Sequence, residues 1–187
     1  MIDEYSTDRT GWARFSDDRK LRYRLRRILT IRGLEIHDGM VVGLRIITFI
    51  MLNPSIADAF IVDPTVRKCV RFAQLWGADV LEVVNLHAWR ATDPRELYKL
   101  VGDPRSPAWH VPNNLEILDA CKPANRVIAA WGNHGELDGR AERVRELVAD
   151  HGIVLEHLGL TESGYPLHPL ARGKSHIPYE REPVVWA

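Results

Sequence analysis

Short apolar runs alternate along the chain with segments in which apolar residues recur at helical spacing. Four runs are continuous and rich in β-branched residues, and they cover residues 45–52, 79–86, 125–132 and 152–160. This composition is typical of strands that are buried on both faces of a sheet. Helical spacing predicts helices at residues 64–76, 93–100, 113–121 and 138–150. Strands that alternate with helices predict parallel βαβ units with right-handed crossovers.

The first predicted helix has recognisable signals at both ends. Asp63 suits the position that caps the amino terminus, and Pro64 suits the first helical position. Gly77 lies just beyond the predicted end, where a glycine commonly stops a helix. These signals make this helix the best defined in the sequence.

The N-terminal part follows a different pattern. Residues 21–37 alternate apolar with basic positions, and Gly33, Asp38 and Gly39 are turn signals. We expect a basic β-hairpin or edge strands here. The arginines are compatible with two interpretations: they could flank a strand of the core, or they could form a surface that faces phosphates. Residues 1–20 carry few large apolar side chains, which predicts a flexible or late-docking arm.

Together these patterns predict a single α/β domain over residues 21–187, preceded by the arm. The expected fold is a three-layer α/β/α sandwich with a central, mainly parallel four-stranded sheet, plus the N-terminal basic hairpin. In such sheets ligands bind beyond the carboxyl ends of the strands. The polar residues that follow each predicted strand are therefore the first candidates for a site.

Charge and cysteine content narrow the classes of function. Lys plus Arg and Asp plus Glu both number 25, so the net charge is zero, and a nucleic-acid-binding protein with this balance has to gather its basic residues on one face. Cys69 and Cys121 are far apart and predict buried free thiols in a reducing cytosol. No apolar run approaches the ~20 residues that span a membrane. We expect a cytoplasmic protein with no membrane partner.

The residues that follow the predicted strands are rich in amides and imidazoles and poor in carboxylates. Asn53 and Ser55 follow the first run, Asn85 lies near the end of the second, and His134 and His168 follow the third and fourth. No ligand spacing predicts a metal, and no serine-hydrolase elbow, Walker loop or dinucleotide motif occurs, so we expect no metal and no cofactor. The remaining groups can position a water, read the edge of a base and donate to a developing anion.

Four motifs, in order, resemble the uracil-DNA glycosylase superfamily over roughly residues 45–175. Residues 53–55 resemble the Asn-Pro motif that positions water in the mismatch-specific branch, and Asn85 with residues 90–92 resembles its middle strand and following turn. Residues 131–134 are similar to the Trp-Gly-Ser-His segment. Residues 168–170 correspond to the His-Pro-Ser loop that enters the minor groove. A closer likeness, carried by the same motifs, is to a bacterial and phage domain family of unknown function.

The glycosylase resemblance implies an enzyme that hydrolyses the N-glycosidic bond of a uracil-like, mismatched or modified base flipped out of DNA. Asn53 would position the water and His168 would donate to the base carbonyl. The implied substrate-binding residues are Ser55, Phe60, Asn85, His134, Leu170, Arg172 and Lys174. Two departures affect the substrate: Asn53 stands where the most active members have an Asp, and the His-Pro loop lacks both serines.

The sequence leaves two other functions open. One is a non-catalytic nucleic-acid or nucleotide binding module on the same fold, and the other is a hydrolase of free nucleosides or nucleotides. Each candidate residue also has a structural alternative: Asn53 and Asn85 could serve turns, and His168 could be an ordinary loop histidine. The base, the preferred strand form and the oligomeric state do not follow from the sequence.

Overall fold

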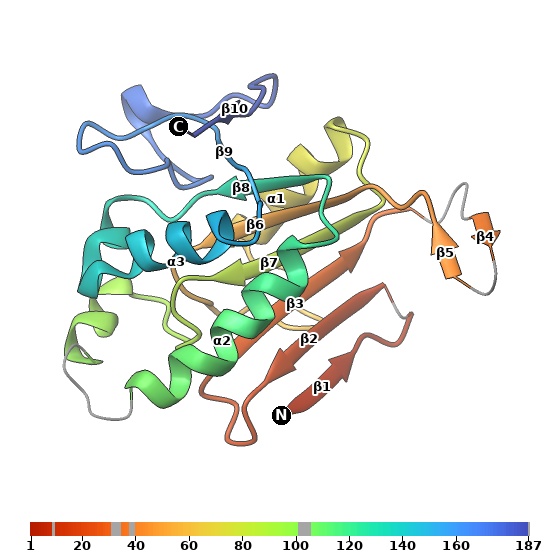
Figure 1. Cartoon of the computed structure of the whole chain (residues 1–187), viewed down its shortest axis with the longest axis horizontal. Helices are drawn as coiled ribbons and strands as arrows, with labels where there is room; N and C mark the ends of the chain where they lie inside the picture. The colour runs from red at the N-terminus through yellow and green to blue at the C-terminus, as the bar shows by residue number, and fades with distance from the viewer. Residues whose placement is uncertain (9, 31–34, 38–39, 101–105, 187) are drawn as a thin grey trace.

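The computed structural model describes residues 1–8, 10–30, 35–37, 40–100 and 106–186, and side chains are described outside 31–42 and 101–109. Its centre is an eight-stranded sheet (Figure 1). In spatial order the strands are β1 (Ile2–Tyr5), β2 (Gly11–Phe15), β3 (Arg22–Ile28), β7 (Val80–Asn85), β6 (Ile46–Met51), β8 (Arg126–Ala129), β9 (Leu155–His157) and β10 (Val184–Val185). Two further strands, β4 (Glu35–His37) and β5 (Met40–Val42), pair only with each other.

The sheet is mixed, which corrects the expected central, mainly parallel four-stranded sheet. Strand β6 pairs in parallel with β7 and β8, and β8 pairs in parallel with β9. The pairs β1–β2, β2–β3, β3–β7 and β9–β10 are antiparallel. The added strands were missed because they lack the continuous apolar runs that identify strands buried on both faces.

The expected basic hairpin is also wrong, because Arg22–Ile28 forms one strand inside the sheet, between β2 and β7. Two of its four arginines are paired with a carboxylate. Arg24 donates to both carboxylate oxygens of Glu82 at 2.9 and 3.0 Å, and Arg26 donates to the same carboxylate. Glu82 is 1% exposed, so this side of the strand is stabilised by a buried ion pair. The predicted turn residues Gly33, Asp38 and Gly39 lie outside the described residues.

Residues 1–20, expected as an arm, contribute strands β1 and β2 to the same sheet. Ala13 and Phe15 of β2 are fully buried in the core. Trp12, on the alternate parity, lies under the guanidinium groups of Arg14, Arg24 and Arg26 at 5.1 to 5.6 Å from its ring centre. On this face of β2, cation–aromatic contacts thus take the place of the aliphatic packing by which strands are usually predicted.

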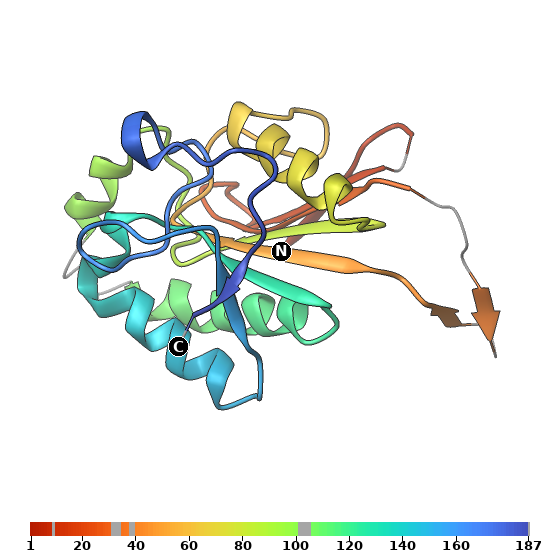
Figure 2. The same cartoon turned by 90° about the horizontal axis from the view of Figure 1, so that it is seen from above.

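Helices cover both faces of the sheet (Figure 2). Helix α1 (Pro64–Leu75) lies on one face with the C-terminal segment, whereas α2 (Ser106–Cys121) and α3 (Arg140–Ala149) lie on the other. The capping prediction for α1 is confirmed, because the Asp63 side chain accepts a hydrogen bond from the Val66 amide at 2.8 Å. The 3-10 segments are η1 (Pro94–Leu100), η2 (Asn133–Gly139) and η3 (Gly173–Ser175).

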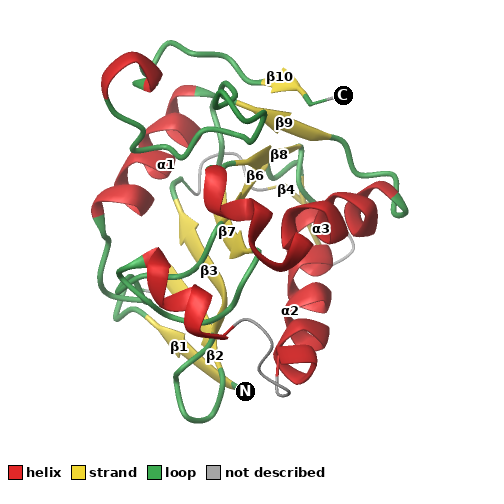
Figure 3. Cartoon of the chain, turned by 90° about the vertical axis from the view of Figure 1, so that its left-hand side faces the viewer, coloured by secondary structure: helices red, strands yellow, loops and turns green. Residues whose placement is uncertain are grey.

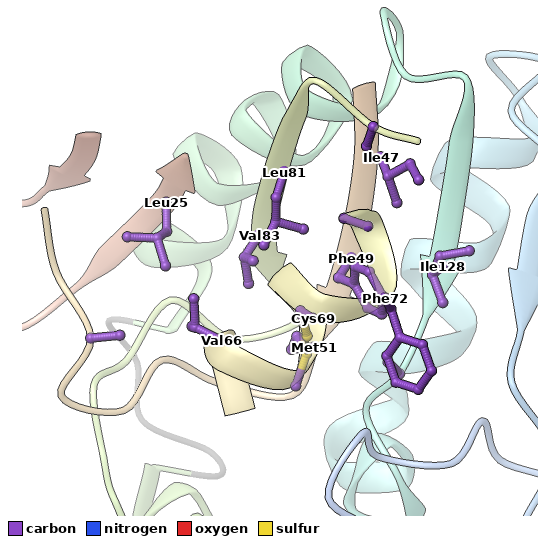
Figure 4. Packing of buried hydrophobic residues seen from close by; sticks show 14 of the residues in the cluster. Leu25, Ile47, Phe49, Met51, Val66, Cys69, Phe72, Leu81, Val83 and Ile128 are labelled. Carbon is purple, nitrogen blue, oxygen red and sulfur yellow. Dashed lines mark hydrogen bonds between the residues drawn. The ribbon is translucent and has the colours of Figure 1, made fainter. Parts of the chain in front are cut away.

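Alternate residues of the central strands divide the core into two clusters. Phe49 and Met51 pack with Cys69 and Phe72 of α1 (Figure 4). The other parity, including Ile50, faces α2 and α3. Both cysteines are free and buried, as predicted. Burial raises the pKa of the Cys121 thiol to about 12, so this thiol stays protonated and unreactive.

The carboxyl ends of β6, β7, β8 and β9 meet at one edge of the sheet, because these strands are parallel. This edge is on the left in Figure 1 and faces the viewer in Figure 3. Strand β3 is antiparallel to β7, so its first residue, Arg22, lies at the same edge. We call this edge of the sheet, with the loops that leave it, the carboxyl edge.

Candidate functional site

Asn85 is the last residue of β7 and lies at the carboxyl edge. Its side chain shares a parity with Leu81 and Val83, which belong to the core cluster on the α1 side. The residue is 1% exposed, and neither its Oδ1 nor its Nδ2 has a hydrogen-bond partner among the described residues. A buried amide without partners is costly to the folded state. An amide of this kind is a strong candidate for a ligand contact.

Asn53 follows β6, and hydrogen bonds fix its side chain. The Nδ2 group donates to the carbonyl oxygens of Ala91 at 2.8 Å and Pro54 at 3.2 Å. These bonds tie the end of β6 to the chain that follows β7. They use the amide nitrogen, so any water held by Asn53 has to be a donor to its Oδ1.

Two arginines of β3 hold the loop that connects Asn53 to α1. Arg22 donates from Nη1 to the carbonyl oxygen of Ala57 at 2.7 Å. Arg27 donates to the carbonyl oxygens of Asp58 and Ile61. Burial lowers the pKa of Arg22 to about 9, which still leaves it charged at pH 7. Of the two interpretations of this basic segment, these contacts favour a structural one, because the two guanidinium groups contact protein carbonyls.

The tip of this loop exposes apolar side chains. Asp58 Oδ1 accepts hydrogen bonds from the amides of Phe60 and Ile61 at 2.9 and 2.8 Å, which makes a tight turn. The side chain of Phe60 is 59% exposed as a result. An aromatic ring held in solvent beside a polar site is available to stack on a ligand.

His168 lies in the loop after β9 and packs beside the end of β8. A β-carbon added to Gly132 would lie 3.8 Å from Cβ of His168. The Nδ1 atom accepts a hydrogen bond from the Leu170 amide at 3.1 Å. Burial lowers the pKa of His168 to about 4, with a smaller contribution from Lys68, while Asp63 acts in the opposite direction. The imidazole is therefore neutral at pH 7 and carries its proton on Nε2.

His134 is bonded to a residue that the sequence did not indicate. Its Nδ1 lies 3.0 Å from the Tyr98 hydroxyl, a contact that joins η1 to η2. The two rings meet edge to face. Tyr98 is 44% exposed, and nothing in its sequence context separates it from an ordinary surface tyrosine.

A second polar group lies beneath the end of β7 on the α2 side. Asn113 donates from Nδ2 to the carbonyl oxygens of Asn85 and Leu86 at 2.9 and 3.1 Å. Arg140 donates from Nε to the same Leu86 oxygen at 2.7 Å. His87 is buried beside them, and burial lowers its pKa to about 3. The available signal in the sequence was a pair of asparagines at 113–114 in a predicted helix.

The remaining predicted residues lie in the loops after β6 and β9. Ser55 is half-buried in the loop after β6, and Leu170 is 37% exposed two residues after His168. Arg172 and Lys174 are exposed. The predicted residues thus belong to three groups, one after β6 and β7, one after β8 with His134 alone, and one in the loop after β9.

No group of three or more His, Cys, Asp or Glu side chains is arranged to hold a metal ion in the part of the chain that the structure describes. Within the same residues, no helix is long and apolar enough to cross a membrane.

The fold is a mixed sheet with helices on both faces, and polar side chains gather at the carboxyl ends of its parallel strands. The chain belongs to a family described as a protein of unknown function (DUF1643), whose model matches residues 22–170. The expected family of unknown function is thus found. The matched residues run from Arg22, at the start of β3, to Leu170, in the loop after β9. No curated protein and no solved structure matches the chain.

Proposed function

We propose that the protein hydrolyses the N-glycosidic bond of a uracil-like, mismatched or modified base that has been flipped out of DNA. The observation that carries this proposal is the buried, unpartnered amide of Asn85 at the carboxyl edge. The motif resemblance to the uracil-DNA glycosylase superfamily supports the same assignment.

The Asn85 amide suits the edge of a base. It offers one N–H donor and one carbonyl acceptor side by side, which complements a pyrimidine edge that presents a carbonyl next to an N–H. The buried amide also lacks partners within the described protein, so a bound base would supply bonds that folding leaves unmade. This gain would offset part of the few kcal/mol needed to unstack a base.

His168 would stabilise the leaving base. When water attacks C1′ of the sugar, an O–C1′ bond forms, the C1′–N bond breaks and its electron pair moves onto the base, which leaves as an anion and finally takes up the proton that the water loses. A neutral imidazole with its proton on Nε2 can donate a hydrogen bond to the base carbonyl where this charge develops. A donor in such a position contributes about 3 kcal/mol to transition-state stabilisation.

Asn53 would hold the attacking water through Oδ1, because its nitrogen is bonded to backbone carbonyls. Phe60 would stack on the flipped base, and Leu170 would fill the space left in the duplex. His134 would contact the base or sugar from η2. Ser55, Arg172 and Lys174 would bind phosphates on either side of the target nucleotide.

The test uses labelled duplexes and single strands that carry uracil, a thymine mismatch or a modified base, followed by alkaline cleavage at abasic sites. We expect scission with at least one base, and loss of scission in Asn85→Ala and His168→Ala variants. Asn133→Ala, which removes an exposed amide from the same edge, is the matched control and should retain activity. Absence of scission on every base by correctly folded protein would contradict the proposal.

A non-catalytic binding module on the same fold is the second candidate. The observation that favours it is the engagement of the two nearby carboxylates: Asp58 bonds two amides of its own turn, and Asp63 caps α1. Neither is placed as a free general base. This alternative predicts that a base-containing oligonucleotide binds tightly and is released unchanged, and that Asn85→Ala weakens binding.

A further inference from the structure

Two segments on the α1 side of the sheet contain no acidic residue. They are residues 64–78, which include α1, and residues 163–179, and the whole chain nevertheless has equal numbers of acidic and basic residues. The two segments are joined in space. Lys68 donates from Nζ to the carbonyl oxygen of Ile177 at 2.9 Å, and the Phe72 and Tyr179 rings lie 5.4 Å apart. We call the surface formed by these segments the α1 surface (Figure 2).

Four cationic side chains of the α1 surface are exposed and unpaired. Arg67 and Arg71 lie on α1, and Arg172 and Lys174 lie in the segment that packs against it. Within the described residues, none of these four side chains forms a hydrogen bond or an ion pair. Other arginines are engaged, as in the pairs Arg126–Glu156 and Arg143–Asp138.

The clustering of these positive charges destabilises the folded state, and no contact among the described residues compensates for it. Arg67 and Arg71 are four residues apart on a helix, where side chains are close neighbours and like charges repel each other. The nearby Asp63 is 7% exposed and occupied as the cap of α1, so it is poorly placed to neutralise the surface. An external anion with regularly spaced charges would relieve this repulsion.

We propose that the α1 surface binds the phosphate backbone of DNA, through Arg67 and Arg71 together with Arg172 and Lys174, whatever base the strand carries. The identity of the polyanion rests on the proposed function. The surface is well placed for this role, because α1 begins beside His168 and directly follows the loop that exposes Phe60. The chain has no net charge, and the α1 surface gathers basic residues on one face, as nucleic-acid binding requires. Backbone binding would bring a strand to the carboxyl edge before any base is recognised.

The experiment measures fluorescence anisotropy of a labelled 20-nucleotide DNA of ordinary bases, single-stranded and duplex, over a range of NaCl concentrations. The test variant is Arg67→Gln/Arg71→Gln. The matched control is Lys122→Gln/Arg143→Gln, which removes the same charge from exposed positions of the α2 and α3 side. Thermal unfolding of each variant shows whether it remains folded.

We expect the test variant to bind duplex about tenfold or more weakly at low salt. The slope of log K against log [salt] should become shallower by about 0.9 for each phosphate contact removed. The control variant should bind as the wild type does. The inference is overturned if the wild type does not bind, if both variants lose affinity equally, or if the slope of the test variant is unchanged.

Strand scission separates this inference from the proposed function. If the wild type releases a base and the test variant does so with unchanged KM, backbone binding by α1 is wrong and the glycosylase proposal stands. If no base is ever released and the test variant alone loses affinity, the α1 surface is a DNA-binding surface and the glycosylase proposal fails.

Discussion

The side chain of Asn113 on α2 donates a hydrogen bond to the carbonyl oxygen of Asn85, 28 residues earlier in the chain, at 2.9 Å. The same amide nitrogen reaches the carbonyl oxygen of Leu86 at 3.1 Å. Asn113 therefore fixes the backbone at the point where β7 delivers Asn85 to the site. One helix residue supports both the stability of the sheet edge and the position of the proposed base-reading amide.

Replacing Asn113 with Leu should leave these carbonyl oxygens with fewer partners in a buried place. We expect the free energy of unfolding to fall by about 1–3 kcal/mol, as for other unsatisfied buried groups. Urea unfolding measures the change. The exposed Asn133→Ala variant should stay within about 0.5 kcal/mol of the wild type, and a similar loss in both variants would contradict this account.

Asn85→Leu should have the opposite effect on stability. It removes two buried polar atoms that have no described partner and substitutes an apolar side chain of similar size. We expect a gain of about 1 kcal/mol in the free energy of unfolding together with loss of base recognition. Thr48→Val is the control, because the Thr48 hydroxyl is buried but donates to the Ala120 carbonyl oxygen at 2.8 Å. The control should lose stability, and a loss of stability in Asn85→Leu would show that this amide is satisfied.

Glu82→Leu should be strongly destabilising, because it leaves Arg24 buried with Glu116 as its nearest carboxylate at 4.0 Å. We expect a loss of about 3–5 kcal/mol. Glu82→Gln keeps the shape and one acceptor oxygen, and it should cost less. Chemical denaturation compares the two variants, and equal losses would indicate that side-chain shape matters here rather than charge.

Arg22→Met should release the loop after β6 without unfolding the domain. The Ala57 carbonyl loses its guanidinium donor, so amides of residues 57–61 should exchange hydrogen faster and chymotrypsin should cut after Phe60. Arg71→Met, on the exposed side of α1, should change neither result. Unaltered exchange in Arg22→Met would mean that Arg27 alone holds the loop.

Acid should destabilise the protein between about pH 6.5 and pH 4. Burial lowers the pKa of His168 and His110 to about 4 and that of His87 to about 3, whereas an unfolded histidine titrates near 6.5. The unfolded state therefore binds protons first as the pH falls. The stability from these groups is fully present above pH 6.5 and is lost as the pH approaches their folded pKa values.

The size of this effect follows from about 1.4 kcal/mol for each pKa unit, which gives a loss of a few kcal/mol for each of these histidines over the window. Urea titrations at intervals from pH 7 to pH 4 measure it. His87→Gln should reduce the slope, whereas replacement of the exposed His151 should not. A wild-type slope close to zero between pH 6.5 and pH 5 would contradict the depressed pKa values.

Local signals in the sequence predict α1 and the central strands well. Asp63 and Pro64 define the start of α1 because capping depends on neighbouring residues only. Continuous apolar runs identify β6, β7 and β8 for a similar reason. The sequence prediction for β3 was wrong because Glu82, which pairs with Arg24 and Arg26, is more than fifty residues away, and no local pattern indicates such a partner.

The candidate site shows the same difference between local signals and partners that are distant in the sequence. Asn53, Asn85 and His168 could be selected because they follow apolar runs. The engagement of Nδ2 of Asn53 and the neutral state of His168 depend on how distant loops pack, so the sequence could not supply them. Tyr98 and Arg140 carry no local signal and emerge only when η1, η2 and α3 are placed beside the sheet.

The antiparallel direction of β3 has a consequence for comparing related chains. A search confined to positions downstream of each parallel strand would pass over Arg22, which is the first residue of an antiparallel strand and lies at the edge for that reason. Among related chains, the presence of this arginine should correlate with the length of the loop that contains Ala57. A guanidinium group has a fixed reach, so it can support only loops of similar size.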